Sequence, residues 1–234
     1  MRKNWILWCL CALLLIGCGS VEKGETMEIG ETAGSPETGE TVEMTLPEKA
    51  EEAPANEDFV RVREYVPGVW QELRYATEGN FTGKVIYDFT DAYLRYGTVK
   101  KLIAVSEELA QQGLYLKIWD GFRPVKAQFA LWEVCPDPNY VANPNVGHSS
   151  HSRGNTVDLT LVDRDGWEVE MPTEFDDFSA LADRDYSDCT ETAAQNARLL
   201  EETMERHGFK GYYGEWWHFA DTEVYPVEED FYPE

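Results

Sequence analysis

The chain has 234 residues and a formal net charge of −24 at pH 7. A chain of this length suffices for one domain with its own hydrophobic core. The strong negative charge excludes a nucleic-acid-binding protein and a domain that lies flat on anionic lipid, because both need basic surfaces.

The first residues have the pattern of a secretory signal. Arg2 and Lys3 precede an uncharged apolar run at 5–16, which is shorter than the roughly 20 residues that a membrane-spanning helix needs. The run is followed by glycine and Cys18, which resembles a bacterial lipobox. We therefore expect 1–18 to be a lipoprotein signal peptide, with lipidation of the cysteine and export to the outer face of the bacterial cell membrane. An uncleaved signal anchor with an incidental cysteine is the alternative.

Residues 19–58 are a different kind of sequence. They hold 12 acidic residues against 2 lysines and contain no aromatic residue. Such a segment buries too little apolar surface to offset the entropy of ordering the chain. We expect a disordered acidic tether over 19–58 and a single domain over 59–234.

Secondary structure in the domain is predicted from the period of its apolar residues, which is 2 in strands and 3.6 in helices. Gly113 and Gly208 are typical helix stops. Because strands and helices are mixed without regular βαβ units, we expect an α+β fold with a mainly antiparallel central sheet flanked by helices. In chain order the predicted elements are a strand at 59–63, a helix at 98–112, a strand at 114–119, a helix at 124–134, a loop at 136–152, a strand at 156–162, a helix at 191–207 and a strand at 212–220.

Two segments contain the residue types of a metal site. His151 ends the polar loop, and Asp158 follows on the polar face of the next strand, with Gly154 allowing the turn between them. His218 lies in the last predicted strand, three residues after Glu215. Two imidazoles and one carboxylate leave zinc a fourth position for water, which is the arrangement of a catalytic rather than a structural site.

The remaining chemistry needs a base and a positive group. Glu215 is the candidate general base, and Arg123 is the candidate for stabilising the oxyanion of a tetrahedral intermediate. Residues three apart in a regular strand face opposite sides, so Glu215 and His218 share one site only if the strand is bent or bulged. Each residue also has a non-functional interpretation. His151 would then be an ordinary loop histidine and His218 a packed histidine of the strand. Asp158 would be a surface residue, and Arg123 the partner of a structural carboxylate.

The two segments read S-x-H-x-x-G-x-x-x-D and E-x-W-H. These patterns resemble those of the zinc D-Ala-D-Ala peptidases, which include dipeptidases and D,D-carboxypeptidases. The family usually has alanine where this chain has Thr156, a departure that keeps the side chain small. The resemblance implies one Zn²⁺ per domain, with His151, Asp158 and His218 as its ligands and Glu215 as the catalytic base.

Further segments resemble the vancomycin-resistance type of dipeptidase. The resemblance implies that Arg123 stabilises the transition state and that Asp176 lies near the free amino group of the substrate, with Asp177 as the alternative. Ser149 and Tyr75 are candidate substrate-binding residues, although Tyr75 also fits a core position. The segments that carry this resemblance are 73–77, 80–83, 119–124, 150–154, 158–161 and 171–176.

The implied activity is hydrolysis of the D-Ala-D-Ala dipeptide to two D-alanines. A D,D-carboxypeptidase that trims peptidoglycan stem peptides is the alternative favoured by export, since stem peptides carry D-Ala-D-Ala outside the cell. A third alternative is a non-catalytic, zinc-containing lipoprotein that binds wall peptides, but such a protein needs neither Glu215 nor Arg123. A disulfide between Cys135 and Cys189 stays open, and their spacing does not favour a zinc–thiolate site.

Overall fold

The computed structural model describes residues 53–233. The predicted signal peptide, the lipidation site at Cys18 and nearly all of the predicted tether therefore lie outside the described residues. Within 53–233, no helix is long and apolar enough to cross a membrane.

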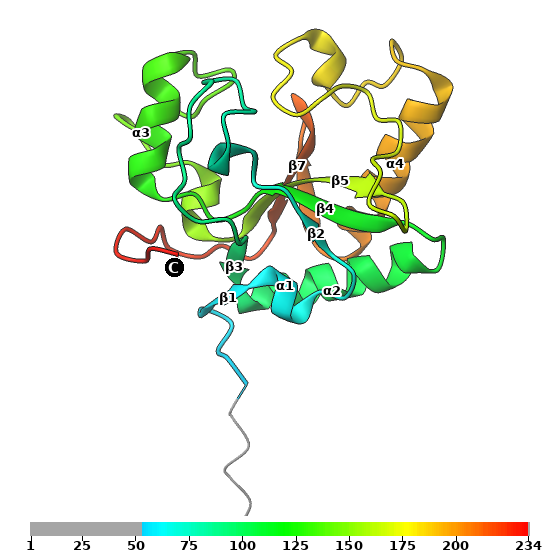
Figure 1. The fold of residues 1–234 in the computed structure, drawn as a ribbon, viewed down its shortest axis with the longest axis horizontal. Helices are drawn as coiled ribbons and strands as arrows, with labels where there is room; N and C mark the ends of the chain where they lie inside the picture. The colour runs from blue at the N-terminus through cyan, green and yellow to red at the C-terminus, as the bar shows by residue number, and fades with distance from the viewer. Residues whose placement is uncertain (1–52, 234) are drawn as a thin grey trace, which may run out of the picture. The chain divides into compact units, whose positions relative to one another are not determined.

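A five-stranded sheet forms the centre of the domain (Figure 1). Neighbouring strands are antiparallel except for β2 and β4, which run parallel. This arrangement confirms the predicted α+β fold with a mainly antiparallel sheet. In spatial order the strands are β2 (Trp70–Gln71), β4 (Tyr115–Asp120), β5 (Thr156–Val162), β7 (Glu215–Asp221) and β6 (Phe209–Tyr212).

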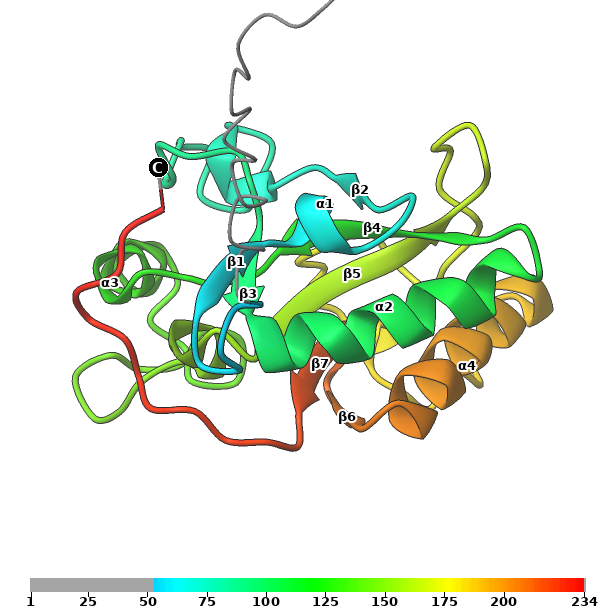
Figure 2. The same cartoon turned by 90° about the horizontal axis from the view of Figure 1, so that it is seen from below.

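The two longest helices lie side by side against the sheet, as Figure 2 shows. They are α2 (Tyr96–Ala110) and α4 (Glu191–Arg206), and both end close to the predicted glycines. Gly113 and Gly208 have φ values of +74° and +87°, which other residues rarely adopt. Helix α3 (Val125–Val134) lies apart from this pair (Figure 1).

Shorter elements complete the described chain. A second, two-stranded sheet pairs β1 (Phe59–Arg61) with β3 (Tyr93–Arg95). Helix α1 spans Val62–Tyr65. Three 3₁₀ turns occur at Arg74–Ala76, Ser150–Arg153 and Ala180–Ala182.

Two predicted strands are wrong in their extent. The strand expected at 59–63 ends at Arg61, because its partner β3 offers only three residues for pairing and the chain then turns into α1. The strand expected at 212–220 is the hairpin of β6 and β7, with the turn at 213–214. Aromatic residues occur on both sides of this turn, so the sequence pattern does not mark it.

Strand β5 has no polar face exposed to solvent, so Asp158 is not the surface residue of the alternative interpretation. All seven of its residues are buried, and β5 is the middle strand of the five. Its polar side chains, Thr156, Asp158 and Thr160, are therefore in the interior, where a polar group costs free energy unless it has a partner. The buried carboxylate of Asp158 calls for such a partner.

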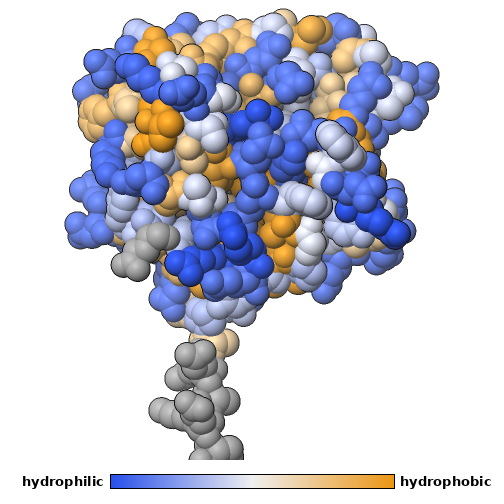
Figure 3. Space-filling view, in the orientation of Figure 1, coloured by the Kyte–Doolittle hydropathy of each residue, from blue (hydrophilic) through white to orange (hydrophobic). Residues whose placement is uncertain are grey.

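The hydrophobic core contains much of the chain's aromatic content. Trp119, Trp216 and Trp217 are each 1% exposed. The face of the domain in Figure 3 is mostly hydrophilic, with hydrophobic side chains in separate patches. Cys135 and Cys189 are both partly buried free thiols, so the structure contains no disulfide between them.

Substitution of Gly154 by alanine is expected to destabilise the domain. Its φ is +74°, and an added Cβ would overlap the ring of Phe59. Left-handed strain and overpacking together cost about 2–4 kcal/mol, so the melting temperature should fall by roughly 5–10 °C. Gly113→Ala is the matched control in calorimetry, because Gly113 has the same φ and open space at its Cβ. An equal fall in the two variants would contradict the packing argument.

Candidate active site

The 3₁₀ turn before β5 fixes the orientation of His151. The Ser149 hydroxyl caps this turn by accepting the backbone N–H of His151 at 3.3 Å. The ring Nδ1 donates to the carbonyl oxygen of Gly121 at 2.9 Å, since that oxygen can only accept. The proton therefore sits on Nδ1, and Nε2 is left with a free lone pair, as a metal-binding imidazole requires.

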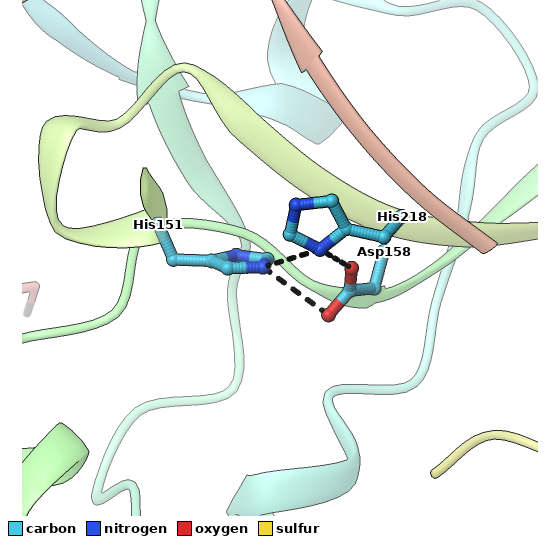
Figure 4. Close-up of side chains that lie close together, drawn as sticks. All are labelled: His151, Asp158 and His218. Atoms are coloured by element: carbon cyan, nitrogen blue, oxygen red, sulfur yellow. Dashed lines mark hydrogen bonds and ion pairs between the residues drawn. The ribbon is translucent and has the colours of Figure 1, made fainter. Parts of the chain in front are cut away.

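The three predicted ligands converge on one point (Figure 4). Asp158 reaches His218 Nδ1 through Oδ1 at 3.0 Å and His151 Nε2 through Oδ2 at 3.3 Å. The two imidazole nitrogens are 3.4 Å apart. Register pairing places Asp158 directly opposite His218 on β5 and β7, while His151 enters from the preceding turn. Among residues 53–233 this is the one group of three or more such side chains close enough to share a metal ion.

The spacing of these atoms fits zinc. Two ligand atoms at ~2.0–2.1 Å from a tetrahedral zinc lie ~3.3–3.4 Å from each other, and the three observed separations are 3.0–3.4 Å. Asp158 Oδ1 is buried and, although it lies 3.0 Å from His218 Nδ1, it accepts no hydrogen bond. A cation bound between the three side chains would satisfy this oxygen, so the residues fit the metal that the sequence implies.

An irregularity in β7 brings Glu215 to the same side as His218. The pairing of β6 with β7 shifts by a bulge: Gly211 pairs with Phe219, but the next residue, Tyr212, pairs with Glu215. The three residues of β7 between these two pairs have no partner on β6. Glu215 Oε2 consequently lies 3.5 Å from His218 Nδ1. The bulge that the sequence argument required is present, and it aims the candidate base at the metal-binding atoms without making it a fourth member of the group.

Arg123 lies three residues beyond β4 and is held by a buried carboxylate. Its Nε and Nη2 both donate to Oδ2 of Asp120, at 3.0 and 2.6 Å. The same Nη2 lies 3.9 Å from Asp158 Oδ2. The guanidinium therefore lies beside the three candidate ligands and lines the same cavity, which is where an oxyanion-stabilising group is needed.

All predicted site residues of the domain line one cavity of about 260 Å³. Tyr75 and Ser149 are buried in its wall, and the Tyr75 hydroxyl donates to Asp176 Oδ2 at 3.0 Å. Asp177 is not among the lining residues, and its carboxylate accepts the backbone N–H of Ser179 instead. Of the two aspartates considered for the substrate's amino group, the geometry therefore favours Asp176, whose backbone has a φ of +57°.

The other two histidines lie outside this site. His148 is exposed, and His207 pairs with Glu108 at 2.8 Å. Within the site, burial alone would raise the pKa of Asp158, but its two neighbouring imidazoles outweigh burial and hold the pKa well below its usual range. The carboxylate of Asp158 is thus ionised across the physiological range.

Burial raises the pKa of two further carboxyl groups. Desolvation raises the pKa of Glu215 to about 7, opposed by His218 and reinforced by Asp158. Desolvation, with a smaller contribution from Asp158, also raises the pKa of Asp176 to about 7. A carboxyl group with a pKa near neutrality can both take up and release a proton at working pH, which suits Glu215 to general acid–base chemistry.

The substitution Asp176→Asn is expected to stabilise the metal-free protein at high pH only. The native pKa of about 7 lies above the ordinary value, so this carboxyl contributes stability at low pH that is lost as pH rises through 7. Asparagine carries no charge and tolerates the positive φ of this position. In chelator-treated protein, the variant's melting temperature should exceed that of the wild type by roughly 5 °C at pH 8 and match it at pH 4.

The same comparison has a clear opposite outcome. A variant that melts below the wild type at pH 8 would show that the ionised Asp176 is stabilised by its surroundings. Asp177→Asn is the matched control, because the amide oxygen of asparagine can still accept the backbone N–H that Asp177 accepts, so the melting temperature should change little at either pH value.

Sequence reasoning missed the groups that hold the predicted residues. Asp120 is fully buried and accepts hydrogen bonds from Arg123 and from the hydroxyl of Tyr87, at 2.8 Å for the latter. Gly121 holds His151 through its backbone. The sequence did contain a signal for Asp120, which is an acidic residue at the end of a buried strand and three positions before an arginine. The contact of Gly121 is made by its backbone carbonyl, which no sequence pattern marks.

Comparison with known proteins agrees with this geometry. A family model described as D-ala-D-ala dipeptidase matches residues 55–233. A D-alanyl-D-alanine dipeptidase of Escherichia coli (strain K12) is 41% identical over 167 residues, covering 70% of this chain and 86% of the relative. The enzymes of the same name from Enterococcus faecium and Streptomyces coelicolor are each 35% identical, covering 72% and 70% of this chain and 94% and 91% of their own length. The chain therefore belongs to the D-Ala-D-Ala dipeptidase family.

Proposed function

We propose that this protein is a zinc metallopeptidase that hydrolyses D-Ala-D-Ala to two molecules of D-alanine. The observation that carries the proposal is the meeting of His151, Asp158 and His218 in one cavity with a glutamate of raised pKa and a buried arginine. Membership of the family and the names of the relatives support the same reaction.

Zinc is the cofactor, and the residues that would hold it are His151 through Nε2, His218 through Nδ1 and Asp158 through a carboxylate oxygen. When bound there, zinc lowers the pKa of water toward 7 and polarises the carbonyl of the substrate. The hydrogen bond from His151 to Gly121 holds the imidazole in the tautomer that this binding needs.

Glu215 moves the proton in the proposed reaction. Its carboxylate takes a proton from the attacking water as the water oxygen bonds to the carbonyl carbon. It then gives that proton to the amine nitrogen as the C–N bond breaks, which releases two free amino acids. Glu215 lines the cavity and lies 3.5 Å from His218 Nδ1, so one carboxylate is within reach of both transfers. Arg123 donates to the oxyanion that forms between the two steps.

The cavity suits a short substrate with a free amino group. Its volume of about 260 Å³ lies below the ~300–1,000 Å³ of sites that hold drug-sized ligands. Asp176 is our candidate for the substrate ammonium, because it lines the cavity and is already oriented by the Tyr75 hydroxyl. Ser149, which lines the same cavity, is a candidate for a polar contact with the dipeptide.

We also propose that the protein is exported and anchored by lipid on the outer face of the bacterial cell membrane. The support is the sequence alone: a basic start at Arg2 and Lys3, a short apolar run and the lipobox-like cysteine at Cys18. An acidic tether over 19–58 would then hold the domain at 59–234 away from an anionic surface. Metabolic labelling with a fatty acid tests this, and label retained in Cys18→Ala would contradict it.

The reaction is tested by incubating the zinc-loaded protein with D-Ala-D-Ala and, separately, with a stem pentapeptide that ends in D-Ala-D-Ala. We expect release of D-alanine from the dipeptide and little from the pentapeptide, with both abolished by a chelator. Release mainly from the pentapeptide would contradict the dipeptidase function and indicate a wall carboxypeptidase. No release from either substrate by zinc-loaded protein would contradict both.

A further inference from the structure

A buried glutamine joins the arginine of the cavity to the cavity's outer wall. Gln128 lies on α3, is 2% exposed and does not line the cavity. Its Oε1 accepts a hydrogen bond from Arg123 Nη1 at 2.9 Å. Its Nε2 donates to the carbonyl oxygen of Ala142 at 2.8 Å. Gln128 therefore touches the arginine and the wall loop without reaching the space that a substrate occupies.

Arg123 needs a second anchor to keep its orientation. Both of its contacts with Asp120 converge on one oxygen, Oδ2, whereas Oδ1 is used by Tyr87 and by the backbone N–H of Gly121. Held by Asp120 alone, the guanidinium could pivot about this oxygen, because the two-oxygen fork geometry that fixes its plane is absent. The Tyr75 ring, whose centroid is 5.2 Å from the guanidinium carbon, adds packing but no directional hydrogen bond. The bond from Nη1 to Gln128 is on the other side of the guanidinium and prevents that pivot.

The amide of Gln128 is itself held in one orientation. A guanidinium only donates and a backbone carbonyl only accepts, so the amide satisfies both neighbours only with Oε1 toward Arg123 and Nε2 toward Ala142. Rotating the amide by 180° would break both hydrogen bonds and leave buried polar groups unpaired. The position of the Ala142 carbonyl therefore decides how Gln128 presents its oxygen to the arginine.

That carbonyl belongs to a segment that forms one side of the cavity. Residues 138–142 contribute five consecutive lining residues. Two backbone hydrogen bonds to the carbonyl of Asp137, from Tyr140 at 3.1 Å and Val141 at 2.9 Å, make the segment a compact turn. The ring of Tyr140 also stacks on Phe178 at 4.7 Å, so the turn contacts the opposite wall as well.

We propose that Gln128 is a positioning residue for the hydrolysis. It holds the Arg123 guanidinium toward the reacting carbonyl. Because its amide also bonds to Ala142, the orientation of the guanidinium depends on the position that the 138–142 turn takes beside the substrate. The inference rests on the proposed function, because the action of Arg123 on the oxyanion is part of that function.

Two substitutions separate the two hydrogen bonds. Gln128→Met has a similar volume and removes both of them. Gln128→Glu keeps an acceptor for Arg123 but replaces the donor to Ala142 by an oxygen. We expect Gln128→Met to lower kcat by about tenfold to a hundredfold and to change KM by less than about threefold. The reason is that the lost hydrogen bond holds the charged Arg123 guanidinium, which acts on the oxyanion of the transition state. We expect Gln128→Glu to recover most of kcat and to raise KM, since only the wall turn is released.

Gln195→Met is the matched control, because Gln195 is an exposed residue of α4 that bonds only to Glu191 among the described side chains. It should leave kcat and KM unchanged. Zinc content and melting temperature are measured for every variant. If Gln128→Met and Gln128→Glu lose the same fraction of kcat and the same number of degrees in melting temperature, the role of Gln128 is purely structural and the inference is overturned. An unchanged kcat in Gln128→Met would also overturn it. Wild-type protein that releases no D-alanine from D-Ala-D-Ala would instead refute the proposed function, and the role of Gln128 with it.

Discussion

Replacing Glu215 with alanine is expected to lower kcat for D-Ala-D-Ala hydrolysis by about a hundredfold to ten-thousandfold while the protein still binds zinc. The reason is that Glu215 supplies the proton transfers, which contribute a factor of this size, and is not one of the three converging ligands. Its Oε2 lies 3.5 Å from His218 Nδ1, close enough to act on a water held there. Turnover is followed by D-alanine release and zinc by elemental analysis.

Glu229→Ala provides the control for this experiment, because Glu229 is exposed and lies outside the cavity. It should show wild-type turnover. Glu215→Ala protein that binds one zinc and turns over at a near-normal rate would show that another group is the base. Loss of zinc together with activity would instead make Glu215 a ligand.

Replacing His151 with alanine is expected to abolish stable zinc binding and, with it, hydrolysis. Changes that merely reorient a ligand weaken metal binding by about 10–100-fold, so loss of the ligand itself should exceed that range. The remaining pair, Asp158 and His218, offers two ligands only. The ring of His151 is 2% exposed, so its removal also leaves a small cavity, and the fold is checked by circular dichroism.

The matched control is His148→Ala, three residues earlier on the same loop, where the side chain is exposed. Elemental analysis should find about one zinc in this control and none in His151→Ala after dialysis. An unchanged zinc content in folded His151→Ala would contradict the assignment of this residue as a ligand.

The fold was predictable where one physical signal dominates. Helices α2 and α4 follow from apolar spacing and end near Gly113 and Gly208, whose positive φ values stop them. Strand β5 was predicted at its observed bounds, Thr156–Val162, but not its burial on both faces. Burial of both faces depends on what packs against the two sides of the sheet, and that is a property of the whole fold rather than of the strand's own sequence.

The ligand set of the site was easier to predict than the groups that orient it. Histidines are few, and a histidine seven residues before an aspartate on a strand is a recognisable pattern. The short distance between Glu215 and His218 depends on a bulge in β7 opposite Gly211 and Tyr212. The three-residue spacing of Glu215 and His218 predicts that the strand is bent or bulged, but no residue pattern gives the position of the bulge. Asp120 and Gln128 are only three and five residues from Arg123 in sequence, but their burial and their convergence on one guanidinium emerge only from the folded chain.

The central claim is that one zinc, held by His151, Asp158 and His218, makes this cavity an active D-Ala-D-Ala dipeptidase. The most direct test is a zinc titration of metal-free protein, with D-alanine release from D-Ala-D-Ala measured at each step. We expect no activity without metal and a linear rise that saturates at one zinc per chain. Activity in metal-free protein, or no activity with one zinc bound, would contradict the claim.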